Sequence, residues 1–185
     1  MYRESELTKR PRLRQRKTRE IIDTEQSYLE SLSNLVDRYY YPMKEITVSR
    51  GRFFSSPLLK PKDHSTIFMN ILLILEFHKS FFAELCMEYN NWPAAPVRLG
   101  RKFIQFSPFL KLYTEYTNCY QQSANTLQAC LKDSNFGTWM ESHRLENMDC
   151  VPLESLLIMP IQRIPRYRML IEEVVKYTPE EHVDY

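Results

Sequence analysis

The chain has 185 residues, of which 43% are hydrophobic and 26% charged, and its formal net charge is +2. This length suits one domain with a full hydrophobic core, and the composition is ordinary for a soluble globular protein. A net charge this small argues against general affinity for nucleic acid.

Several classes of functional site are excluded by what the sequence lacks. The three glycines are isolated, so we expect no loop that cradles phosphate and no direct nucleotide binding. The four cysteines have no C-x-x-C spacing and the four histidines are scattered, so we expect reduced thiols, no metal site and no cofactor. No apolar run approaches the ~20 residues that cross a bilayer. The N-terminus lacks the apolar core of a secretory signal, and we expect a cytoplasmic protein.

The first 16 residues are predicted to be a basic N-terminal arm, followed by one domain over residues 17–185. The run from Lys9 to Lys17 is locally basic. We interpret it as a solvated arm that precedes the first helix, with contact to an anionic membrane surface as the alternative.

Residues from about Lys17 to Glu45 are predicted to form one long helix, which Pro42 bends or ends. Side chains at heptad spacing form three columns, and eight of the nine positions are apolar: Ile21, Tyr28, Leu35; Ile22, Leu29, Val36; Glu25, Leu32, Tyr39. The exception is Glu25, a carboxylate that is unfavourable in a core unless it finds a partner. Two interpretations are open. Glu25 either pairs within the domain or faces solvent where the helix leaves the bundle, or it is held at the surface for a second protein.

After a connector over residues 46–62, a second helix is predicted to run from an N-cap at Asp63 to about Tyr89. His78 lies within it, and we interpret it as a satisfied histidine rather than a metal ligand. The residues from Asn90 to Pro96 break this helix.

A third helical region is predicted over residues 98–133, with an interruption near Ser107 and Pro108. Its aromatic stripe is interpreted as core and comprises Phe103, Phe106, Phe109, Leu110, Tyr113, Tyr116 and Tyr120. The sequence Asn135-Phe136-Gly137 then indicates a break, followed by a short helix over residues 138–146. The expected strand content is close to nil.

The last segment, residues 151–185, has an amphipathic pattern with one polar strip. Gln162, Arg166, Met169 and Glu173 fall at i, i+4, i+7 and i+11, which places them on one face of a helix. The remaining faces are apolar, so this strip is left for a partner. Pro160 and Pro165 either delay the helix start until about Pro160 or kink it, and we expect a bend.

The run LLIMPIQRIPRYRMLIEEVVKYT, residues 156–178, resembles the most diagnostic segment of the Dbl homology (RhoGEF) domain. Its IPRY sequence is similar to members that carry a lipid-binding FYVE zinc finger. Two other regions also match the family. Thr24, Glu25, Tyr28 and Leu32 fit the T-E-x-x-Y-x-x-x-L pattern of its first conserved region, and FSPFLKLYTEYTNCY, residues 106–120, resembles its second.

The resemblance implies an all-α, elongated multi-helix bundle that acts as a guanine-nucleotide exchange factor for Rho-family small GTPases of the Rho, Rac or Cdc42 type. It implies that Glu25 contacts the first switch loop of the GTPase. Gln162, Arg166 and Met169 would face the second switch. The family usually has lysine at the place of Arg166 and leucine at that of Met169, whereas Arg163 and Tyr167 are expected to be structural. Exchange requires differential binding and no covalent step, so no covalent catalytic residue is implied.

In the family a further long helix completes the GTPase-binding surface, and this chain ends at Tyr185, about where that helix should begin. We therefore expect the chain to be weakly active or inactive and to expose an apolar strip. A pleckstrin homology domain commonly follows in the family and would supply membrane association. One alternative function is a helical scaffold that binds a GTPase or another protein without nucleotide release, and a weaker one is a basic helical module for membrane surfaces.

Overall fold

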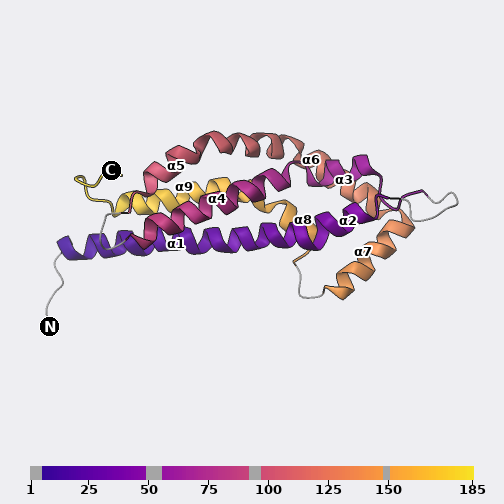
Figure 1. Cartoon of the computed structure of the whole chain (residues 1–185), viewed down its shortest axis with the longest axis horizontal. Coiled ribbons are helices and arrows are strands. Elements are labelled where there is room, and N and C mark those ends of the chain that lie inside the picture. The colour runs from indigo at the N-terminus through magenta and orange to yellow at the C-terminus, as the bar shows by residue number, and fades with distance from the viewer. Residues whose placement is uncertain (1–5, 49–55, 92–96, 148–150) are drawn as a thin grey trace. The chain divides into compact units, whose positions relative to one another are not determined.

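The computed structural model describes residues 6–48, 56–91, 97–147 and 151–185. Every regular element in these ranges is a helix, which confirms the predicted all-α class (Figure 1). The elements are α1 (Glu6–Leu35), the π-helix η1 (Val36–Tyr40), α2 (Tyr41–Glu45), α3 (Pro61–Phe68), α4 (Ile71–Asn90), α5 (Leu99–Phe106), the 3₁₀ helix η2 (Ser107–Leu110), α6 (Lys111–Leu131), α7 (Ser134–Glu146), α8 (Leu153–Leu157) and α9 (Met159–Lys176).

The chain folds into two compact units. The first comprises Met1–Leu29, Glu76–Leu110 and Gln162–Tyr185, and the second comprises Glu30–Leu75 and Lys111–Ile161. The residues that the family resemblance implies for GTPase binding all belong to the first unit: Glu25, Gln162, Arg166 and Met169.

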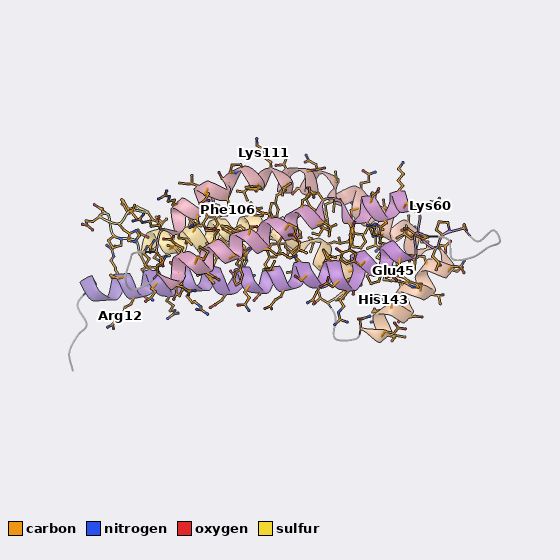
Figure 2. All side chains as sticks on the ribbon, viewed as in Figure 1. Arg12, Glu45, Lys60, Phe106, Lys111 and His143 are labelled. Atoms are coloured by element: carbon orange, nitrogen blue, oxygen red, sulfur yellow. The ribbon has the colours of Figure 1, made fainter. Side chains whose placement is uncertain are left out.

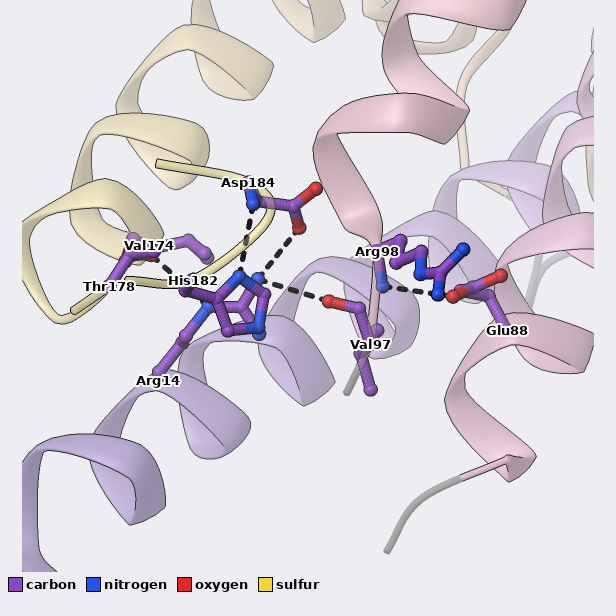
Figure 3. A network of polar contacts seen from close by, with 8 residues as sticks. All are labelled: Arg14, Glu88, Val97, Arg98, Val174, Thr178, His182 and Asp184. Atoms are coloured by element: carbon purple, nitrogen blue, oxygen red, sulfur yellow. Dashed lines mark hydrogen bonds and ion pairs between the residues drawn. The ribbon is translucent and has the colours of Figure 1, made fainter. Parts of the chain in front are cut away.

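The first helix begins earlier than the sequence predicts. α1 starts at Glu6 and includes the basic run, so the interpretation of that run as an arm preceding the helix is wrong. Arg14 within it is buried, and its Nη2 lies 2.7 Å from the Asp184 carboxylate and 3.1 Å from the Val97 carbonyl oxygen. Its Nε donates to the Thr178 hydroxyl at 3.1 Å (Figure 3). This turn is therefore held within the first unit.

A π-helical segment accommodates Pro42. Proline has no N–H, so the carbonyl of Arg38, four residues earlier, loses its usual intrahelical donor. The Nε2 of His143 lies 2.5 Å from that carbonyl oxygen, and the Tyr41 N–H bonds to Val36 instead. The helical run then ends at Glu45, as predicted.

The second predicted helix is split in two. α3 begins at Pro61, which suits a first helical position because its missing N–H needs no partner there. The N-cap position therefore falls on Lys60, and the prediction of Asp63 as the cap is wrong. Met69 adopts a positive φ of 51° and separates α3 from α4, which ends at Asn90, one residue beyond the predicted end.

The segment Pro61–Asn90 is long and apolar enough by composition to cross a membrane, so the expectation that no run approaches this length is wrong here. Half of its most apolar window is buried within the protein, as a core helix of a bundle would be. Ile71, Ile74 and Leu85 of α4 are fully or almost fully buried.

An aromatic cluster forms much of the core of the first unit. The ring centroid of Phe81 lies 5.2 Å from the ring centroids of Phe103 and Phe106, and the ring centroid of Phe103 lies 5.4 Å from that of Tyr167. Figure 2 shows Phe106 on the side of α5 that faces α4. α4, α5 and α9 are thereby packed together.

The predicted aromatic stripe is core only in part. Tyr113 and Tyr116 are buried, whereas Phe109 is 50% exposed and Leu110 is 38% exposed. These two residues lie in η2, whose tighter 3₁₀ turn changes the angle between successive side chains and shifts the stripe out of phase.

Hydrogen bonds from buried side chains hold the second unit together. Ser123 of α6 donates to the Ile67 carbonyl at 2.6 Å, and Tyr116 donates to that of Leu157 at 2.7 Å.

The carboxylate of Asp133 accepts from the backbone N–H groups of Asn135 and Phe136, so α7 begins at Ser134 and the predicted break at residues 135–137 is wrong.

The last helical segment also divides. α8 ends at Leu157, and α9 restarts at Met159 with Pro160 in its first turn, where no intrahelical donor is required. The delayed start is thus the correct alternative at Pro160, and the expected bend there is wrong. Pro165 lies inside α9.

Replacing the cap of α7 tests this local assignment. Asp133→Ala should lower the free energy of unfolding by about 1 kcal/mol, because two backbone donors lose their acceptor. Asp133→Ser is the control, since serine retains an acceptor oxygen. Equal stability of the alanine variant and the wild type in urea unfolding would contradict the assignment.

Candidate functional site

The predicted polar strip lies on the outer face of α9. Gln162, Arg166 and Met169 are exposed, and the side chain of Met169 is 61% exposed. Arg163 follows Gln162 in the sequence, and Tyr167 follows Arg166. Both Arg163 and Tyr167 are buried. The sequence therefore placed the strip correctly, while its binding role stays a prediction.

Glu25 does not lie at a surface. Its side chain is 0% exposed, and its carboxylate accepts hydrogen bonds from His78 Nδ1 and Arg163 Nη2, both at 2.5 Å, and from the Tyr167 hydroxyl. The prediction that Glu25 is held at the surface to contact a GTPase is wrong. The alternative interpretation, a partner within the domain, is the one observed, because a buried carboxylate requires such donors.

The surroundings of this carboxylate keep it ionised. Burial alone would raise the pKa of Glu25, but the hydrogen bond and charge of His78, the charge of Arg163 and the Tyr167 hydroxyl outweigh it, and the pKa lies below its usual value. The Arg163 guanidinium also contacts two aromatic rings, 4.2 Å from the Tyr167 centroid and 5.1 Å from that of Tyr28.

The structural roles expected for Arg163 and Tyr167 are confirmed. Both are buried, with Arg163 3% exposed and Tyr167 6% exposed. Burial and the charge of Glu25 raise the pKa of Tyr167 well above its usual value, so its hydroxyl remains protonated and donates. His78 is likewise a satisfied core histidine.

The exposed acid that borders the strip is Glu20, which the sequence interpretation missed. Lys17 Nζ lies 3.1 Å from the Glu20 carboxylate and 3.7 Å from that of Glu173, the last residue of the strip. The side chains of Glu20 and Glu173 are 47% and 44% exposed. The heptad pattern could have identified Glu20 as the exposed acid, because it places Glu25 in a core column and leaves Glu20 outside all three columns.

The described part of the chain contains no group of three histidine, cysteine or acidic side chains that could hold a metal ion. The features that the site offers are a cation, an amide and a thioether on α9 and carboxylates at the border with α1. Such a surface suits hydrogen bonding and packing against another protein.

Comparison with known proteins defines the class of this all-helical chain. The RhoGEF domain model matches residues 18–185. The chain belongs to the RhoGEF family, which confirms the resemblance to the Dbl homology domain.

Similar proteins include Rac guanine nucleotide exchange factor JJ from Dictyostelium discoideum, at 33% identity over 96% of this chain. Mouse FYVE, RhoGEF and PH domain-containing protein 2 is 30% identical over 91% of the chain. The chain spans 14% and 25% of the lengths of these two proteins. Among solved structures, autoinhibited Vav1 superposes with a TM-score of 0.80 at 25% identity, over 95% of this chain and 31% of Vav1.

Glu25→Ala should lower the free energy of unfolding by about 3–5 kcal/mol, because it leaves the buried Arg163 without its carboxylate. Glu76→Ala is the matched control. Glu76 is on α4, pairs with Lys79 at 2.6 Å and is 67% exposed, so its loss should cost less than about 1 kcal/mol. Urea unfolding of the two variants measures the difference. Equal losses of stability would contradict the assignment of Glu25 and Arg163 as a buried ion pair.

Proposed function

We propose that this chain is a guanine-nucleotide exchange domain that acts on a small GTPase of the Rho, Rac or Cdc42 type. The observation that carries the proposal is the exposed strip of Gln162, Arg166 and Met169 in a chain of the RhoGEF family. A similar protein is named as an exchange factor for Rac, which supports a GTPase of this class.

The mechanism we propose is differential binding. A GTPase holds its nucleotide through a phosphate loop, a Mg²⁺ ion and two switch segments. A protein that binds the nucleotide-free state more tightly than the loaded state must weaken nucleotide affinity by the same factor. The exchange step therefore requires a complementary surface and no covalent intermediate.

Each member of the strip has a distinct role in this proposal. Arg166 makes a charge-assisted hydrogen bond to the second switch, Gln162 contributes its amide, and Met169 packs against apolar groups. Arginine keeps the charge of the lysine usual in the family and adds a planar fork of donors.

In this proposal Glu20 takes the role that the family resemblance implied for Glu25. It is exposed on α1, and Lys17 connects it to Glu173 at the end of the strip. We propose that the Glu20 carboxylate accepts hydrogen bonds from the first switch loop. The activity is proposed for the cytoplasm, with membrane recruitment supplied by a neighbouring domain, as the family resemblance implies.

Release of a fluorescent GDP analogue from a panel of Rho-type GTPases tests the exchange function. Arg166→Ala should slow release at least about thirty-fold, because truncating one member of a desolvated charged contact costs about 2–5 kcal/mol. The matched control is Arg168→Ala on the same helix. Arg168 is 82% exposed, pairs with Glu172 and points away from the strip, so its loss should leave release unchanged.

Other outcomes identify the competing functions. Binding of a GTPase by the wild-type chain without any nucleotide release would favour the scaffold. Affinity for anionic vesicles with neither GTPase binding nor release would favour the membrane module.

Glu20→Ala should also slow release, by about tenfold, while leaving the fold intact because the side chain is 47% exposed. Glu141→Ala is the control, since Glu141 forms an i,i+3 pair with Arg144 and is 56% exposed in the second unit. The same release assay measures both. If Glu20→Ala and Glu141→Ala behave alike, Glu20 has no part in the binding surface.

A further inference from the structure

The buried carboxylate of Glu25 connects three helices of the first unit. Glu25 is on α1, His78 is on α4, and Arg163 and Tyr167 are one turn apart on α9. All four side chains are at least 94% buried, and the donors come from two different helices. The Glu25 carboxylate therefore connects α1 to both α4 and α9 through hydrogen bonds.

Stability alone does not account for this arrangement. The heptad columns of α1 are otherwise apolar, and a well-packed hydrophobic residue in place of a buried ion pair is often neutral or stabilising. Apolar packing tolerates adjustment of a helix about its axis, whereas hydrogen bonds are directional. A cluster of directional bonds thus specifies one rotation of α9.

The exposed strip depends directly on that rotation. Gln162 precedes Arg163, and Arg166 precedes Tyr167, so each proposed binding residue is adjacent in sequence to a residue that Glu25 holds. The side-chain surface of a helix lies about 5–6 Å from its axis, so a rotation of about 10° moves it by about 1 Å. A displacement of this size can reduce the rate of a positioned reaction by about a hundredfold.

We propose that Glu25, His78, Arg163 and Tyr167 form a positioning cluster that sets the orientation of the Gln162, Arg166 and Met169 strip for nucleotide exchange without touching the GTPase. The cluster acts through α9, so its members are positioning residues. This inference rests on the exchange function proposed above.

Tyr167→Phe is the least disruptive test, because it removes one hydrogen bond to Glu25 and keeps the ring that packs on Phe103 and Arg163. Tyr116→Phe is the matched control. Tyr116 is also buried, and its hydroxyl donates to a backbone carbonyl in the second unit. Both variants lose one buried hydroxyl. Urea unfolding should show the larger loss of stability in Tyr167→Phe, because its hydroxyl donates to an ionised carboxylate whereas that of Tyr116 donates to a neutral carbonyl.

The two variants should differ in the maximal rate of GDP-analogue release at saturating exchange domain. We expect Tyr167→Phe to lower that rate about tenfold and Tyr116→Phe to leave it within about twofold of wild type. In the Arg166→Ala background, at concentrations that leave a measurable residual rate, the effect of Tyr167→Phe should become smaller, because the charged group of the strip that it orients is absent. Equal effects of the two tyrosine variants, or a Tyr167→Phe effect that adds fully to that of Arg166→Ala, would overturn the proposal.

Amide hydrogen exchange separates a failure of this inference from a failure of the exchange function. If the wild-type chain releases nucleotide from none of the GTPases, the proposed function is wrong. The positioning claim is then decided by the amides of residues 162–170. Faster exchange there in Tyr167→Phe than in Tyr116→Phe supports the positioning cluster, and equal exchange in the two variants overturns it.

Discussion

The first unit depends on the neutralisation of one buried carboxylate. An ionised glutamate in a core is strongly unfavourable unless charged and hydrogen-bonding partners replace its water. Glu25 obtains a guanidinium, an imidazole N–H and a phenol, which come from two other helices. The arrangement of α1, α4 and α9 is consequently specified by polar contacts as well as by apolar packing.

The same helix that supplies two of these partners also carries the exposed strip. On α9, Arg163, Tyr167 and Val174 are buried, and the residues directly before them are Gln162, Arg166 and Glu173. Successive residues on a helix differ by about 100° in direction, so an inward face and a binding face can alternate along one sequence. This division allows one helix to be anchored in the core on one face and exposed to solvent on the other.

The sequence predicted the fold class, the break near Ser107 and the exposed strip, because heptad and helical spacing reflect burial directly. It failed at Glu25, because the pattern did not decide whether this side chain is buried or at the surface. Glu25 sits in a core column, and a carboxylate there is compatible either with a buried partner or with a binding role at the surface. The partners, His78 and Arg163, are 53 and 138 residues away, a separation that local periodicity does not encode. The resemblance to the family then favoured the surface, and burial overturned that assignment.

Helix starts and irregularities were missed for both local and long-range reasons. Proline was expected to bend α9 at Pro160, but a position in the first turn needs no N–H donor, so the helix simply starts there. Before Pro42 the chain forms the π-helix η1, with the carbonyl of Arg38 satisfied by His143, more than a hundred residues further along the chain. The start of α1 at Glu6 was hidden because a basic run resembles a solvated arm, and the burial of Arg14 involves residues near the other end of the sequence.

The most direct measurement compares the affinity of the wild-type chain for one Rho-type GTPase in its nucleotide-free state and in its GDP-loaded, Mg²⁺-bound state. Differential binding predicts markedly tighter binding to the nucleotide-free state, with GDP and Mg²⁺ displacing the chain. Equal affinity for the two states would contradict the exchange mechanism, since a ligand that binds both states equally shifts nothing between them.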